Sequence, residues 1–375
     1  MSLFTLSEAD LRARTSLKWQ TFPSDVLPMW VAEMDAMPLP EAVDAVTEAL
    51  QRGDTGYPYG TGYADAYADL AASRWGWRPA PEQLRRAGDV MNAMLSLLLG
   101  NTAEGDHIVI NPPVYPPFWQ IIAGYRRHIT QVPLTASGRL DLAALEAAFT
   151  GPDAPTAYLL CSPHNPTGTI HTPEELSAVA RLCAEHDVLL IVDEIHALLV
   201  DPGAAFTPIL SLPDAQNAVV TFSAGKCWNL AAFKAGLYIR GTEASALFDR
   251  LPPLANQSTG HIGALAHTAA LRHGEAWVDQ VMVEVAANKD LLTRLVAERL
   301  PGVRYDRAPG TYLAWLDCSG LGLERPRDHF LAQGKVAFNN GSDFGADYGQ
   351  YIRMNLAASP ELITEAVERM ATSLG

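Results

Sequence analysis

Short apolar runs alternate with stretches of helical periodicity between about residues 105 and 241. The runs predict five strands, at residues 108–110, 157–160, 188–192, 219–222 and 237–239. Several of the runs are apolar throughout, as expected of strands that helices cover on both sides. The pattern therefore predicts an α/β fold with a mostly parallel central sheet and helices on both faces.

A helix start lies between two of these predicted strands. Thr172 is a suitable cap, Pro173 suits the first helical position, and Glu175 completes a capping box. Leu176, Val179, Ala180 and Cys183 then share one helical face. This segment is predicted to be the crossover helix of one βαβ unit.

The C-terminal part has a different pattern. A long helix is predicted from about residue 275 to 300, followed by strands at 303–305, 311–316 and 351–354 and a closing helix that begins at Ser359. These elements predict a smaller α+β domain. We expect residues 46–280 to form the large domain, and residues 1–45 and 281–375 the small one, with the boundary inside the long helix.

Composition excludes several classes of protein. The 375 residues include 42 acidic and 27 basic side chains, and the net charge of -15 disfavours binding to nucleic acid or an anionic membrane. No targeting segment or membrane-spanning stretch is evident, so a cytoplasmic protein is expected. The four cysteines and ten histidines show neither disulfide nor metal-site spacing, so no metal is expected.

Lys226 is the candidate reactive centre. It lies just past an apolar run and stands three residues after Ser223. A buried lysine amine that is partly deprotonated can hold a carbonyl cofactor as a Schiff base, and pyridoxal phosphate is the commonest such cofactor. Taken alone, however, a lysine is more typical of a solvated surface.

Open parallel sheets bind ligands at the carboxyl ends of their strands. Polar residues follow four of the predicted strands at these ends, in segments 111–115, 162–168, 193–196 and 223–226. Asp193 comes after five apolar residues and needs a cation or donors to stay charged, which a pyridinium nitrogen would supply. The other segments have ordinary structural alternatives: residues 165–168 are typical of a turn, and His196 and Tyr115 of core packing. One pocket could collect all four segments.

Two phosphate-binding motifs are excluded by spacing. Gly225-Lys226 lacks the P-loop glycine five positions earlier, where Val220 stands, and Cys227 replaces the required hydroxyl residue. Residues 60–62 lack the third glycine and the preceding strand of a dinucleotide fingerprint, so nicotinamide chemistry is not indicated.

Taken together, the motifs resemble those of the fold-type I pyridoxal phosphate enzymes, the class I/II aminotransferase superfamily. The matching segments occur in the family's order: Gly56-Tyr57-Pro58, Pro113-Val114-Tyr115, Asn165-Pro166-Thr167-Gly168, Asp193-Glu194-Ile195-His196, Ser223-x-x-Lys226 and Arg353-x-Asn355. Within this superfamily, the chain resembles the cystathionine β-lyase branch of carbon-sulfur lyases in residues 27–35, 111–115 and 163–168. The resemblance implies the fold-type I architecture and pyridoxal 5'-phosphate as cofactor.

It also implies a role for each matching residue. Lys226 would carry the cofactor and move the α-proton, Asp193 would pair with the pyridine nitrogen, and Arg353 would bind the substrate carboxylate. The remaining residues would contact the cofactor: Asn165 and His196 beside the ring hydroxyl, Tyr115 on the ring, Ser223, Lys234, Met91 and Asn92 around the phosphate, and Tyr57 at the phosphate of a neighbouring subunit. A homodimer with shared sites follows from the last role.

Three functions remain open from the residues. The resemblance favours a β-lyase that cleaves cystathionine or related cysteine thioethers to a thiol, pyruvate and ammonia by α-proton abstraction and β-elimination. A class I/II aminotransferase would begin with the same residues, and Tyr57 and Tyr115 would contribute to the choice between the two outcomes. A regulatory binding role on the same scaffold is the third alternative.

Overall fold

The central sheet of the protein has seven strands. A computed structural model describes residues 2–375, and in it the strand order is β2-β8-β7-β6-β5-β3-β4. The strands are β2 (Leu84–Ala87), β3 (His107–Ile110), β4 (His128–Gln131), β5 (Ala157–Cys161), β6 (Leu189–Asp193), β7 (Val219–Phe222) and β8 (Gly236–Arg240). Strands β3 to β7 pair in parallel, and β8 runs antiparallel to β2 and β7. The predicted mostly parallel sheet is confirmed.

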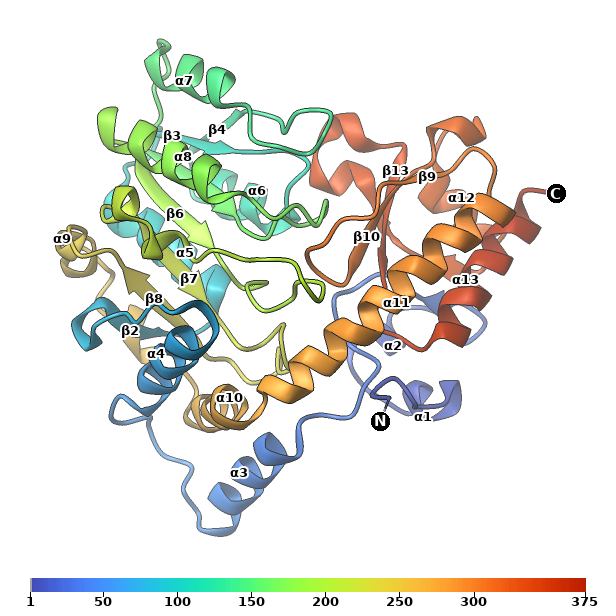
Figure 1. Cartoon of the computed structure of the whole chain (residues 1–375), viewed down its shortest axis with the longest axis horizontal. Coiled ribbons are helices and arrows are strands. Elements are labelled where there is room, and N and C mark those ends of the chain that lie inside the picture. The colour runs from blue at the N-terminus through green and yellow to red at the C-terminus, as the bar shows by residue number, and fades with distance from the viewer. Residues whose placement is uncertain (1) are drawn as a thin grey trace.

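Helices cover both faces of this sheet, as predicted (Figure 1). One face packs on α5 (Val90–Asn101) and α6 (Pro116–Ala123), and the other on α4 (Gly62–Trp75), α8 (Pro173–Glu185) and α10 (His261–His273). Along β5, Leu159 belongs to the first core while Tyr158 and Leu160 belong to the second. Alternate side chains are thus buried on opposite sides, which explains why the run is apolar throughout. The outer helices α7 (Leu142–Thr150) and α9 (Ser245–Asp249) complete this part.

Side-chain caps fix several helix starts, including those of α8 and α5. Thr172 and Glu175 form the predicted capping box at the start of α8. At the start of α5, the carboxylate of Asp89 accepts a hydrogen bond from the backbone N–H of Asn92. This second cap was not predicted, and it lies beside the candidate site.

A second, smaller unit contains a four-stranded antiparallel sheet in the order β12-β13-β10-β9. Its strands are β9 (Arg304–Tyr305), β10 (Leu313–Asp317), β12 (Asn339–Asn340) and β13 (Tyr351–Asn355), and it packs with α12 (Pro326–Ala332) and α13 (Pro360–Ser373). A short parallel pair, β1 (Leu27–Pro28) with β11 (Val336–Ala337), ties the N-terminal region to this unit. The N-terminal helices are α1 (Glu8–Arg12), α2 (Leu17–Gln20) and α3 (Pro40–Gln51).

The long helix α11 (Glu275–Arg299) joins the two units (Figure 1). Val285 still belongs to the core of the central sheet, whereas Leu292 belongs to the core of the smaller unit. The predicted division after residue 280 falls inside this helix and stays a prediction.

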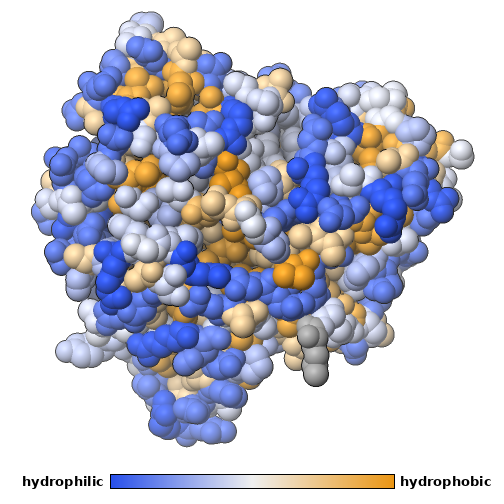
Figure 2. All heavy atoms as spheres, in the orientation of Figure 1, coloured by the Kyte–Doolittle hydropathy of each residue, from blue (hydrophilic) through white to orange (hydrophobic). Residues whose placement is uncertain are grey.

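The surface is mostly hydrophilic on the face seen in Figure 1, with hydrophobic residues gathered toward its middle (Figure 2). Within residues 2–375, no helix is both long and apolar enough to cross a membrane.

Candidate active site

A cavity of about 830 Å³ brings together most of the predicted site residues. Its wall combines residues that follow strands of the central sheet with residues of the smaller unit. The predicted residues that line it are Met91, Tyr115, Asn165, Asp193, His196, Ser223, Lys234, Lys226 and Arg353. Asn92 and Tyr57 do not line it.

Lys226 lies four residues beyond the end of β7, in a turn that is closed by backbone hydrogen bonds from Trp228 and Leu230. Its Nζ donates a hydrogen bond to the carbonyl oxygen of Ala32 at 2.9 Å. Burial and the nearby positive charge of Arg353 lower the pKa of the Lys226 ammonium to about 8. A useful fraction of the side chain is therefore a neutral, nucleophilic amine near neutral pH.

Asp193 is the last residue of β6, and its side chain is only 3% exposed. Its Oδ1 accepts a hydrogen bond from the backbone N–H of Ile195 at 2.9 Å. Burial raises the pKa of the Asp193 carboxyl to about 7, although the Ile195 amide and Lys226 oppose the rise. A cationic partner in the cavity would hold this carboxylate in its charged form.

Arg353 projects from β13 and is held by two side-chain amides. Its Nη1 donates to Oδ1 of Asn165 at 2.9 Å, and its Nη2 donates to Oδ1 of Asn339 at 2.7 Å. The guanidinium carbon lies 4.9 Å from the centre of the Phe344 ring. Its buried Nε has no hydrogen-bond partner among the residues described. Asn339 was not predicted, because nothing in the local sequence marks it as a partner of an arginine.

His196 and Tyr115 also face the cavity. Burial and the positive charges of Lys226 and Arg353 lower the pKa of the His196 imidazole to about 3, so the ring is neutral. Its Nδ1 is buried without a hydrogen-bond partner in the described part of the chain. Burial raises the pKa of the Tyr115 hydroxyl, which therefore stays protonated.

The predicted phosphate-binding residues gather at the start of α5. Ser223 Oγ donates to the carbonyl of Ala235 at 2.7 Å and accepts from the amide of Gly225 at 3.1 Å. Lys234 Nζ forms an ion pair with Oδ2 of Asp89 at 2.8 Å. We call Ser223, Lys234 and the first turn of α5 the phosphate cup.

Asn92, in the first turn of α5, and Tyr57 do not line the cavity. The amide of Asn92 is bonded to Asp89, and its side-chain oxygen accepts from Ser258 at 3.1 Å. Tyr57 lies in the connection between α3 and α4 and is 97% exposed. Its predicted contact with a neighbouring subunit is not tested by a single chain and stays a prediction.

The N-terminal segment 30–35, here called the strap, closes one side of the cavity. Trp30, Val31 and Ala32 line the cavity. The strap is held by Asn355, whose side-chain N–H groups donate to the carbonyls of Val31 and Glu33 at 2.8 and 2.7 Å. The strap thereby places the Ala32 carbonyl against Lys226.

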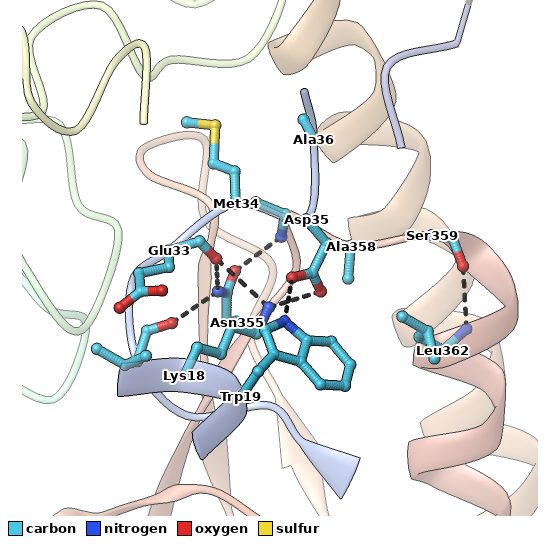
Figure 3. Close-up of polar contacts among 12 residues, drawn as sticks. Lys18, Trp19, Glu33, Met34, Asp35, Ala36, Asn355, Ala358, Ser359 and Leu362 are labelled. Carbon is cyan, nitrogen blue, oxygen red and sulfur yellow. Dashed lines mark hydrogen bonds and ion pairs between the residues drawn. The ribbon is translucent and has the colours of Figure 1, made fainter. Parts of the chain in front are cut away.

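A buried ion pair fixes the far end of the strap, as Figure 3 shows. Lys18 and Trp19 of α2 converge on Asp35: Lys18 Nζ lies 2.6 Å from Oδ2, and Trp19 Nε1 donates to Oδ1 at 2.9 Å. Both charged side chains are fully or almost fully buried. The sequence resemblance covered this segment but did not indicate the pair.

Comparison with known proteins agrees with the geometry. Residues 24–370 match the family described as "Aminotransferase class I and II". A Mycobacterium leprae protein named "Putative cystathionine beta-lyase" is 44% identical over 98% of this chain and 97% of its own. A Corynebacterium glutamicum protein named "Cystathionine beta-lyase" is 32% identical over 97% of this chain and 98% of its own.

Among solved structures, a "putative plp-dependent beta-cystathionase" from Corynebacterium diphtheriae superimposes with a TM-score of 0.94 at 31% identity. The match covers 100% of this chain and 99% of the other. The family match spans most of the chain, and two relatives above 30% identity cover nearly all of it. This chain therefore belongs to the class I and II aminotransferase family.

Proposed function

We propose that this protein is a pyridoxal 5'-phosphate-dependent carbon-sulfur β-lyase that cleaves cystathionine or related cysteine thioethers to a thiol, pyruvate and ammonia. The observation that carries the proposal is that Lys226, Asp193 and Arg353 line one cavity. The full-length relatives named cystathionine beta-lyase favour elimination over other reactions of this family.

The cavity residues fit the cofactor. An aldehyde needs an amine, a pyridinium nitrogen needs a carboxylate, and a phosphate needs cations and hydrogen-bond donors. Lys226, Asp193 and the phosphate cup supply these groups within the same cavity. The buried Nδ1 of His196, which has no partner in residues 2–375, supplies a further polar atom for a ligand.

The protein's own groups would bind the substrate and move its α-proton. When bound, the cofactor supplies an electron sink for the α-carbon. The Arg353 guanidinium, which is bonded to Asn165 and Asn339, would donate hydrogen bonds to the substrate carboxylate from its unpaired Nε and remaining N–H groups. Lys226 would take the α-proton, because its lowered pKa leaves the amine partly neutral. The Ala32 carbonyl would then accept a hydrogen bond from the resulting ammonium.

The test is an assay with L-cystathionine and S-alkyl cysteines in the absence of any 2-oxo acid. A lyase releases thiol and pyruvate together, in equal amounts. An aminotransferase, which the family match and the same residues also allow, releases neither product. When an acceptor is added, it converts the substrate to its 2-oxo acid and leaves the carbon-sulfur bond intact. A Lys226→Ala variant is the control and should be inactive. If that variant kept a cellular effect of the protein, a regulatory role would be favoured.

We also propose that the protein is a homodimer. Tyr57 and the neighbouring Tyr59 are 97% and 98% exposed, which is unusual for two aromatic side chains so close together. A second copy of the chain would cover them and bring Tyr57 to the phosphate cup of its partner. Sedimentation equilibrium should give twice the 40.5 kDa of one chain. A monomer at micromolar concentration would contradict this arrangement.

A further inference from the structure

An acidic side chain lies in the phosphate cup. Asp89 lines the cavity, and its carboxylate bonds to two groups of the cup at once. Oδ2 pairs with Lys234 Nζ at 2.8 Å, and Oδ1 accepts from the amide of Asn92 at 2.7 Å. The carboxylate therefore occupies the kind of position, between an ammonium and a helix N-terminus, that an anionic ligand would take.

The backbone at Gly88 and Asp89 is closely packed on both sides. A side-chain carbon on Gly236 of β8 would come within 3.1 Å of the Asp89 carbonyl carbon, so β8 packs closely against this residue. A side-chain carbon on Gly88 would lie only 2.8 Å from Ser258 Oγ, so the other side is equally crowded. The side chain itself is 32% exposed.

We propose that Asp89 is a built-in competitor of the cofactor phosphate. The proposal rests on the proposed function, because it assigns the cup to pyridoxal 5'-phosphate. A phosphate dianion entering the cup would meet a like charge and would have to draw Lys234 away from Asp89. Asp89 thus lowers the affinity for the phosphorylated cofactor but not for pyridoxal, which has no phosphate. The affinity for pyridoxal 5'-phosphate therefore depends more on the bond to Lys226 than it would if the phosphate cup had no acidic side chain.

The variant that tests the proposal is Asp89→Asn. Asparagine keeps an oxygen that can accept from the amide of Asn92, so the cap of α5 is preserved while the negative charge is lost. Asp343→Asn is the matched control, since Asp343 also lines the cavity but belongs to the turn Gly341–Phe344 of the smaller unit. Full-length proteins are freed of cofactor with hydroxylamine and titrated with pyridoxal 5'-phosphate or pyridoxal, with visible absorbance as the signal.

Asp89→Asn should bind pyridoxal 5'-phosphate about tenfold more tightly than wild type, the effect of one charged contact. Its affinity for pyridoxal should be unchanged, and Asp343→Asn should leave the ratio of the two affinities at the wild-type value. If the affinity of Asp89→Asn for pyridoxal 5'-phosphate, divided by its affinity for pyridoxal, were equal to or below the wild-type value, the proposal would be overturned.

A second measurement does not depend on Lys226 chemistry. Inorganic phosphate should raise the melting temperature of cofactor-free Asp89→Asn more than that of wild type. If neither aldehyde gave a visible band with any variant, the proposed function would fail, and the phosphate series would still decide the role of Asp89. Equal stabilisation of both proteins by phosphate would count against it.

Discussion

Replacing Arg353 with lysine isolates the two-pronged contact with the substrate carboxylate. In the structure, two guanidinium nitrogens are already used by Asn165 and Asn339, and Nε is the buried donor without a partner in residues 2–375. A lysine could keep the positive charge and reach the same amides, but it loses the planar fork. The loss of one charged hydrogen bond costs about 1.5 to 3 kcal/mol, which corresponds to roughly 10- to 150-fold weaker binding.

The assay compares two ligands that differ only in the carboxylate. The visible spectrum of the cofactor-loaded protein is titrated with L-alanine and with L-alaninamide. Arg353→Lys should weaken the binding of L-alanine by the factor above and leave L-alaninamide nearly unchanged. Arg304→Lys, at the exposed position of β9, is the control and should change the binding of neither ligand. An equal loss for both ligands, or no loss, would refute the assigned contact.

Two further predictions concern the lysine and the strap. The rate at which cofactor-free protein reacts with pyridoxal should rise about tenfold per pH unit below the Lys226 pKa of about 8 and level off above it. A rate that levels off only near pH 10.5, the ordinary lysine pKa, would show that burial does not lower the pKa of Lys226. In urea unfolding, Asp35→Asn should cost about 3 to 5 kcal/mol because it leaves the buried Lys18 ammonium unpaired, whereas Lys18→Met with Asp35→Leu should come close to wild type. Equal stability of the single and double variants would contradict that account.

The sequence predicted the buried strands well and the edge strands poorly. All five predicted strands of the central sheet exist within a residue or so, because burial on both faces makes them largely apolar. The edge strands β2 and β4 were missed, since each has a free side that allows polar residues such as Arg86 and His128. In the smaller unit, β12 consists of two asparagines, which have low strand propensity, and was also missed.

In the candidate site too, only part of the arrangement could be predicted from local sequence. Residues just beyond the strand ends could be predicted to meet, because the topology of a parallel sheet brings those ends to one edge. Contacts between residues far apart in the sequence could not be predicted. Arg353 bonds to Asn165, 188 positions away, and no local pattern marks Asn339 as its second partner. Asp89 was passed over because its role depends on Lys234, which lies on a distant segment.

The proposed function requires a covalent bond between Lys226 and the cofactor. The purified protein is incubated with pyridoxal 5'-phosphate, reduced with borohydride, digested and analysed by mass spectrometry. We predict that the visible band disappears and that the phosphopyridoxyl group is found on the peptide containing Lys226. A label found on another lysine, or a protein that stays colourless with added cofactor, would contradict the role of Lys226.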